Sequence, residues 1–151
     1  MFEDGRQLNK AVTDYLRSAK LSEIEAQQHL FGSGQVADLE RKLANHFQMK
    51  HALCVSNATS GLFAVALAIN LKSAEFITSP FTYGGTVASW LVLDNIPAFA
   101  DIEASTLEMN QERIKSLITK KTKAILAVDS FGIPCDSHKL RGIADEFGLW
   151  Y

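Results

Sequence analysis

Four contiguous apolar runs constrain the fold of this chain more than any other feature. They alternate with segments of helical periodicity from residue 51 onward. A strand with one buried face alternates apolar and polar residues, so contiguous runs predict strands that are buried on both faces. The sequence therefore predicts an α/β fold with three layers, α-β-α, around a mostly parallel sheet. The expected strands are 52–56, 75–79, 98–102 and 123–129, and the expected helices lie near 59–70, 84–94, 110–118 and 136–147.

The first fifty residues have helical periodicity without strand-like runs. One face of a predicted helix is apolar, and Gly32-Ser33-Gly34 breaks the chain just before it. A second amphipathic segment is expected over residues 8–16. We thus expect an N-terminal helical segment at 1–50 and a sheet domain at 51–151. The residues that form the apolar face of the predicted helix are Val36, Leu39, Leu43 and Phe47.

Composition excludes several classes of protein. Hydrophobic residues make up 47% and charged residues 21%, which is typical of a globular chain rather than a disordered one. The net charge of -2 gives no basic footprint for nucleic acid. Cys54 and Cys135 form neither a disulfide framework nor a metal-binding spacing, and we expect both to be small buried apolar side chains. Lys120, Lys121 and Lys123 form either a solvated loop or a phosphate site.

No membrane or secretory segment is expected. The N-terminus lacks the apolar core of a signal peptide, which favours a cytoplasmic location. Residues 51–71 and 76–93 are uncharged and long enough to span a bilayer. The first stretch contains serine, threonine and glycine at its centre, and the second contains Pro80, Thr82, Gly84 and Gly85. A strand, a tight turn and a buried helix explain them better than a membrane span does.

The C-terminal residues predict the start of a further strand. Asp136 is expected to cap the last helix and Gly148 to end it, and the apolar run 149–151 follows. A half-formed buried strand exposes unpaired backbone groups. We therefore expect the chain to be the N-terminal part of a longer protein, truncated before its fifth strand. The alternative is a short edge strand at a natural terminus.

The stretch SNATSGL, residues 56–62, is a candidate anion site. It lies between a predicted strand and a predicted helix, and ligands of parallel α/β sheets bind beyond the carboxyl ends of strands. The first backbone N–H groups of a helix lack intrahelical partners and attract anions. A phosphate would be bound by the amides of Ala58, Thr59 and Ser60, aided by the two hydroxyls. The alternative is that Ser56, Asn57 or Thr59 only caps the helix.

A second candidate element, PFTYGG at residues 80–85, also joins a strand to a helix. An aromatic side chain there can lie flat on a planar ring, although a single aromatic is more often part of the core. Together with a phosphate site at the neighbouring strand end, it suggests a flat, phosphorylated cofactor. A separate motif, GSGQVA at residues 32–37, fits the GxGxxA pattern of nucleotide-binding proteins, but a polar, helix-like segment precedes it where a strand is required.

The ordered series HALCVSNATSGLFAVALA and EFITSPFTYGGTVASWLVLDNIPAFADIEASTLEMNQERIKSLITKKTKAILAVDSFGIPCD resembles the DegT-type family of sugar aminotransferases. These are pyridoxal-5'-phosphate (PLP) enzymes of fold type I, and the resemblance covers about residues 30–151. It implies that residues 51–151 are the first part of the PLP-binding large domain. It also implies that Ala58, Thr59 and Ser60 bind the PLP phosphate and that Tyr83 stacks on the pyridine ring.

The resemblance also implies what this chain lacks. The family's Schiff-base lysine and the carboxylate that pairs with the pyridine nitrogen would both fall after Tyr151, so we expect no catalytic residue within the chain. Asp129 stands where the family commonly has histidine, which leaves either a ligand-binding or a structural role. No metal is expected.

The implied activity is amino transfer, from glutamate, to a keto-sugar nucleotide, in a homodimer. The alternative is a catalytically inactive remnant that acts as a binding or structural fragment.

Overall fold

The computed structural model describes residues 34–151, and the amphipathic segment expected at 8–16 lies outside them. The chain divides into two compact units, Met1–Cys54 and Val55–Tyr151. Each unit is described by itself. Within the described residues no helix is both long and apolar enough to cross a membrane.

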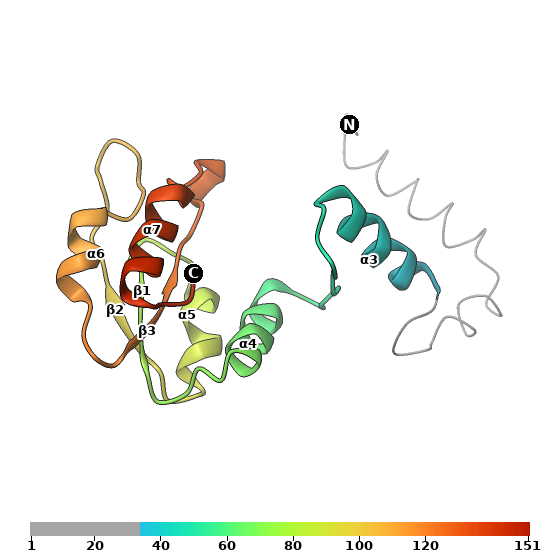
Figure 1. Cartoon of the computed structure of the whole chain (residues 1–151), viewed down its shortest axis with the longest axis horizontal. Helices are drawn as coiled ribbons and strands as arrows, with labels where there is room; N and C mark the ends of the chain where they lie inside the picture. The colour runs from blue at the N-terminus through green and yellow to red at the C-terminus, as the bar shows by residue number, and fades with distance from the viewer. Residues whose placement is uncertain (1–33) are drawn as a thin grey trace. The chain divides into compact units, whose positions relative to one another are not determined.

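The first unit contains the helix α3, Gly34–His46, as the apolar periodicity predicted (Figure 1). Ala37 is its buried residue, whereas Val36, Leu39 and Phe47 are exposed among the described residues. The GxGxxA motif therefore ends inside a helix. The segment before Gly34, where the motif requires a strand, lies outside the described residues.

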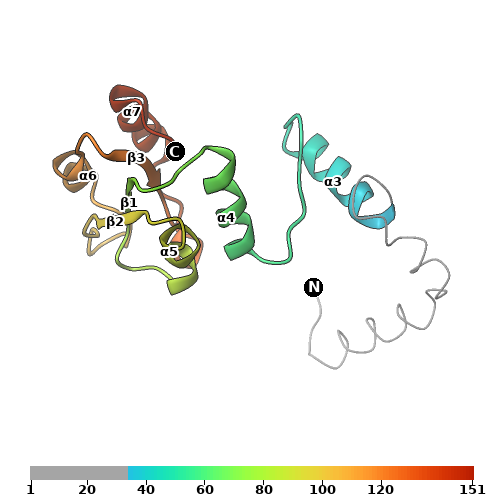
Figure 2. The ribbon, with the colours of Figure 1, turned by 90° about the horizontal axis from the view of Figure 1, so that it is seen from below.

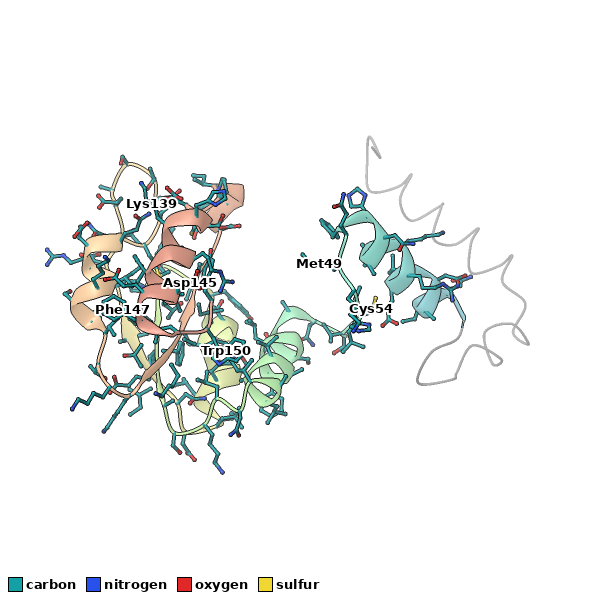
Figure 3. All side chains as sticks on the ribbon, in the orientation of Figure 1. Met49, Cys54, Lys139, Asp145, Phe147 and Trp150 are labelled. Carbon is teal, nitrogen blue, oxygen red and sulfur yellow. The ribbon has the colours of Figure 1, made fainter. Side chains whose placement is uncertain are left out.

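The strand expected at 52–56 does not form. These residues have no regular secondary structure, and the Leu53 side chain is 70% exposed. The Cys54 amide donates a hydrogen bond to a side chain of α3, the Glu40 carboxylate, at 2.8 Å. A strand requires a neighbouring strand to pair its N–H and C=O groups. In the described part of the chain no strand lies beside this segment, so the prediction was wrong here. Figure 3 labels Cys54 and Met49 on the segment that leaves α3.

Three parallel strands form the sheet of the second unit. They are β1 (Glu75–Thr78), β2 (Ile96–Phe99) and β3 (Thr122–Leu126), in the order β2-β1-β3. Ile77 of β1 pairs with Ala98 on one side and Ile125 on the other. The central strand, β1, is therefore paired along both edges.

Two of these strands follow the sequence prediction closely, and β2 does not. It begins two residues before the predicted 98–102 and ends at Phe99. Beyond it, Ala100 still donates a backbone hydrogen bond to Thr78, but Ile102 instead forms an isolated antiparallel bridge with Met109. The chain leaves the sheet at this point because a local turn provides the backbone partners.

Helices cover both faces of the sheet, which confirms the three-layer arrangement. Figure 2 shows the strands between α6 and α7 on one side and α5 on the other, with α4 beside α5. On one face, Ile77 and Ile125 belong to a cluster with residues of α6 and α7, among them Ile114 and Leu140. On the opposite face, the buried cluster consists of Ala66, Leu71, Phe76, Trp90 and Ala124. Neighbouring residues of one strand thus face opposite cores, which explains the contiguous apolar runs.

The helices α4 (Ala58–Ala68) and α5 (Gly84–Leu91) are joined by one buried tryptophan. Trp90 Nε1 donates a hydrogen bond to the Leu62 carbonyl at 2.8 Å. Its ring packs edge-on against Phe76 with a centroid distance of 4.8 Å. Trp90 therefore fixes α4 to α5 and α5 to the sheet.

The helices α6 (Gln111–Leu117) and α7 (Ser137–Phe147) cover the other face. Asp136 caps α7 by accepting from the Lys139 amide, and this bond holds the pKa of the Asp136 carboxyl below its usual value. Gly148 ends α7 in the left-handed conformation, at φ +65°. Both predicted ends of the helix are confirmed. Figure 3 labels Lys139, Asp145 and Phe147 along α7, and Trp150 just beyond it.

The apolar run after Gly148 pairs with β3. Trp150 forms a parallel bridge with Ala124, and the Ile125 amide donates to the Trp150 carbonyl at 2.8 Å. The Trp150 amide donates in turn to Lys123 at 2.9 Å. Residues 149–151 thus take the position of a strand beside β3, as their sequence predicted.

We predict that Trp90→Phe destabilises the protein far more than Trp150→Phe. The first change leaves the Leu62 carbonyl without its donor and should lower the free energy of unfolding by about 1–3 kcal/mol. The second replaces a side chain that is 57% exposed and should change it by about 0.5 kcal/mol or less. Urea unfolding followed by far-UV circular dichroism measures both. Equal effects would contradict this role of Trp90.

Candidate active site

The turn before α4 is a capped helix N-terminus. The Asn57 side chain accepts a hydrogen bond from the Ser60 amide at 2.8 Å, and its backbone carbonyl accepts from Gly61 at 3.1 Å. The amides of Ala58 and Thr59 have no hydrogen-bond partner among the described residues. The cap suggested by the sequence is therefore present, and it occupies one of the three predicted amide donors. Two amides and the nearby hydroxyls remain available for an anion.

The turns before α4 and α5 meet at Gly85. A Cβ atom placed on Gly85 would lie 2.8 Å from Thr59 Oγ1 and 2.6 Å from Cε1 of Tyr83. Both distances are shorter than side-chain contacts allow, so only glycine fits between the hydroxyl and the ring. The structure thus brings together Thr59 and Tyr83, which the sequence predicted to bind two parts of one ligand.

The ring of Tyr83 also borders a hollow of ≈ 410 Å³ at the carboxyl edge of the sheet. Residues 81–83 follow β1 and residues 128–131 follow β3. The last residues of the two strands are tied together, because the buried Thr78 hydroxyl donates to the Leu126 carbonyl at 2.8 Å. The residues that line the hollow are Phe81, Thr82, Tyr83, Val128, Asp129, Ser130 and Phe131. Their position is the usual one for a ligand in a parallel α/β sheet.

Asp129 has a structural bond within this lining. Its carboxylate accepts a hydrogen bond from the Cys135 amide at 2.9 Å and so closes the loop that follows β3. The Cys135 thiol donates to the Val128 carbonyl at 3.4 Å. Burial, aided by the neighbouring Asp129 carboxylate, raises the pKa of the Cys135 thiol. Of the two roles left open by the sequence, the structure supplies evidence for the structural one.

Sequence reasoning missed three residues of this site. Gly85 is recognisable only once α4 and α5 are placed side by side. Phe81 and Phe131 lie fifty residues apart, yet their ring centroids are 5.9 Å apart. The only signal in the sequence was that both are aromatic residues just after a predicted strand.

The lysines of the described residues lie elsewhere, and none lines this hollow. Lys120, Lys121 and Lys123 border a second hollow, of ≈ 390 Å³, at the amino ends of β1 and β3, together with Lys72 and Trp150. In residues 34–151 there is also no group of three or more side chains suited to hold a metal. The candidate site therefore offers amides, hydroxyls and aromatic rings.

A helix terminus with two amides that lack partners among the described residues, beside an aromatic ring at the carboxyl edge of a parallel sheet, is typical of sites for phosphate-bearing ligands. Comparison with known families makes the assignment specific. The sequence profile of the DegT/DnrJ/EryC1/StrS aminotransferase family matches residues 12–151. The chain belongs to this family, whose members use PLP, as the resemblance implied.

Three relatives show how much of such proteins the chain matches. GDP-perosamine synthase from Vibrio cholerae is 37% identical over 112 residues, which are 74% of this chain and 30% of that protein. DesI, solved in the presence of its TDP-sugar product, is 30% identical with a TM-score of 0.73, over 97% of this chain and 35% of that one. NtdA from Bacillus subtilis, solved with bound cofactor PMP, is 25% identical with a TM-score of 0.83, over 93% and 32%.

The chain spans about a third of the length of the relatives it matches. Its sheet and helices have the fold of that part of the fold type I sugar aminotransferases. The fold class expected from the sequence is thus confirmed. The roles of Ala58, Thr59, Ser60 and Tyr83 stay predictions.

We predict that Asp129→Ala increases the rate at which Cys135 is labelled by a thiol reagent at pH 8. The change opens the loop and removes the carboxylate that contributes to the raised pKa of the thiol, so both exposure and the thiolate fraction increase. The experiment is done in a Cys54→Ala background, so that Cys135 alone reacts. Ser130→Ala, next to Asp129 in the chain, is the control and should leave the labelling rate unchanged. An unaltered rate in Asp129→Ala would show that this bond does not close the loop.

Proposed function

We propose that the protein acts in PLP-dependent transfer of an amino group from glutamate to a keto sugar carried on a nucleotide. The observation that carries the proposal is the meeting of Thr59 and Tyr83 at Gly85. Membership of the family and the sugar-nucleotide relatives support the reaction class and the kind of substrate. The glutamate donor follows from the family resemblance alone.

The residues present fit the phosphate end of PLP. The amides of Ala58 and Thr59 and the hydroxyl of Thr59 lie at the N-terminus of α4, where the helix dipole favours an anion. The Ser60 amide is bound to Asn57, so Ser60 contributes through its hydroxyl, which lies 3.4 Å from that of Ser56. A phosphate at this position would replace water as the partner of the free amides.

The residues present also fit the ring end. Tyr83 is 82% exposed, has no cap hydrogen bond from its side chain, and stands between the α4 turn and the hollow. Its ring is free to cover a flat heterocycle, and such stacking contributes about 0.5–1.5 kcal/mol beyond burial. When bound, PLP supplies the electron sink on which amino transfer depends. Tyr83 would orient the ring, while the lining of the hollow keeps water from one side of it.

The second candidate function is a binding or structural role without turnover. The observation that favours it is that no lysine lines the hollow in the described part of the chain. Under this alternative the protein retains no PLP, whereas the enzyme assignment requires retention. Absorbance between roughly 330 and 430 nm, after PLP is added and the free cofactor removed, separates the two functions.

We predict that Tyr83→Ala weakens PLP binding about three- to tenfold, because the stacked ring is lost. Tyr83→Phe conserves the ring and is the matched control, so it should bind PLP as the unsubstituted protein does. Gly85→Ala should also weaken binding, since its methyl group displaces Thr59 or Tyr83. Titration with PLP, followed by absorbance, gives the three affinities. If Tyr83→Ala binds PLP normally, Tyr83 does not belong to the site.

We also propose that the protein forms homodimers in the cytoplasm. The helix α4 is apolar after its first turn, yet Val65 and Leu67 are exposed, as are Leu91 and Val92 at the end of α5. Exposed apolar residues grouped on neighbouring helices are typical of subunit interfaces.

The dimer proposal predicts that Leu67→Lys shifts the protein toward monomers, because a charge is placed within the buried apolar contact. Phe147→Lys is the control, since Phe147 is also an exposed apolar residue, at 42% against 56% for Leu67, and lies on α7 in the opposite helix layer. Light scattering on a gel-filtration column measures the mass of each variant. A monomeric unsubstituted protein, or an equal shift in both variants, would refute this interface.

A further inference from the structure

Phe131 has two features that do not stabilise the fold. Its backbone is left-handed, at φ +55° and ψ +22°, a conformation that is unfavourable for a bulky side chain. Its side chain is 83% exposed, so it gains almost no stabilisation from burial. It is the only aromatic residue with positive φ in the described residues. Strained residues of this kind persist at sites where a ligand uses them.

The loop around Phe131 imposes this conformation. Asp129 binds the Cys135 amide across the loop, and the Ile133 amide donates to Ser130 at 3.0 Å. Gly132, at φ +81°, continues the turn in a conformation suited to glycine. The hydrogen bond between Asp129 and Cys135 therefore positions Phe131. The Asp129 carboxylate is directed to Cys135 and does not itself contact the ligand.

The loop presents Phe131 to the hollow at the carboxyl edge of the sheet. Its ring lies 5.9 Å from that of Phe81, at an angle of 52°, and both line the hollow together with Tyr83. Three exposed aromatic rings around one hollow can contact more than a single planar group. Because Tyr83 is adjacent to the α4 turn, its ring is the one suited to stack on the phosphorylated cofactor. The ring of Phe131 is then available to contact a ring of a second ligand.

We propose that Phe131 is a binding residue for the sugar of the nucleotide-linked substrate. Its ring, braced by Phe81, forms the wall against which the apolar face of the hexose packs, and Asp129 is the residue that positions it. This assignment rests on the proposed function, since it names the part of the site that receives the substrate.

The test compares Phe131→Gly with Phe131→Tyr in two measurements. Glycine relieves the left-handed strain and removes the wall, so the melting temperature should rise by about 3 °C while sugar binding weakens. The dissociation constants of TDP-glucose and GDP-mannose, measured by calorimetry in the PLP-loaded protein, should increase about tenfold. TDP alone, which lacks the hexose, should bind unchanged. Phe131→Tyr keeps the ring and should behave as the unsubstituted protein in both measurements.

Leu107→Gly is the matched backbone control. Leu107 also has positive φ, at +61°, but does not line the hollow, so its replacement should leave sugar binding unchanged. A fall in melting temperature for Phe131→Gly, or equal sugar affinity in Phe131→Gly and the unsubstituted protein, would overturn the proposal. An equal loss of affinity for TDP alone would also overturn it, since the ring would then contact the nucleotide. If the proposed function is wrong, the unsubstituted protein retains no PLP, which is a different result. The melting temperature of Phe131→Gly still tests whether Phe131 is strained in that case.

Discussion

The parallel pairing of β1 with β3 is the interaction on which the candidate site depends. It aligns the carboxyl ends of both strands, and the Thr78–Leu126 hydrogen bond ties them where they end. The loops that follow, 79–83 and 127–131, therefore leave the sheet side by side. Without this register Tyr83 and Phe131 would not line one hollow. The pairing is stable because β1 lies between two other strands and is buried on both faces.

The second constraint is the packing of α4 on α5, which brings the phosphate-type turn to the same edge. Trp90 fixes the two helices through the Leu62 carbonyl, and Gly85 lets the two turns approach to within contact distance. Only glycine fits at position 85, since any side chain would separate the Thr59 hydroxyl from the Tyr83 ring. One face of the sheet thus supplies the anion end of the site, and the edge supplies its aromatic walls.

The sequence predicted most of the architecture and only part of the site. Contiguous apolar runs identified three strands of the second unit, and helical periodicity identified its four helices. The caps at Asp136 and Gly148 were correct because capping is local chemistry. The segment 52–56 failed for a nonlocal reason, since an apolar run becomes a strand only beside a partner. The site was predicted at Thr59 and Tyr83, whereas Gly85, Phe81 and Phe131 depend on contacts between distant residues.

The sequence by itself determined the alternation of strands and helices in the second unit, the capped ends of α7, and which turns carry small polar or aromatic residues at strand ends. These properties follow from periodicity and from the backbone preferences of single residues. Only the tertiary structure decided that the Asp129 carboxylate binds the Cys135 amide and that Phe131 takes a left-handed conformation facing Phe81. The physical reason is that each of these depends on how a loop closes between packed elements, and loop closure is set by contacts rather than by any local preference.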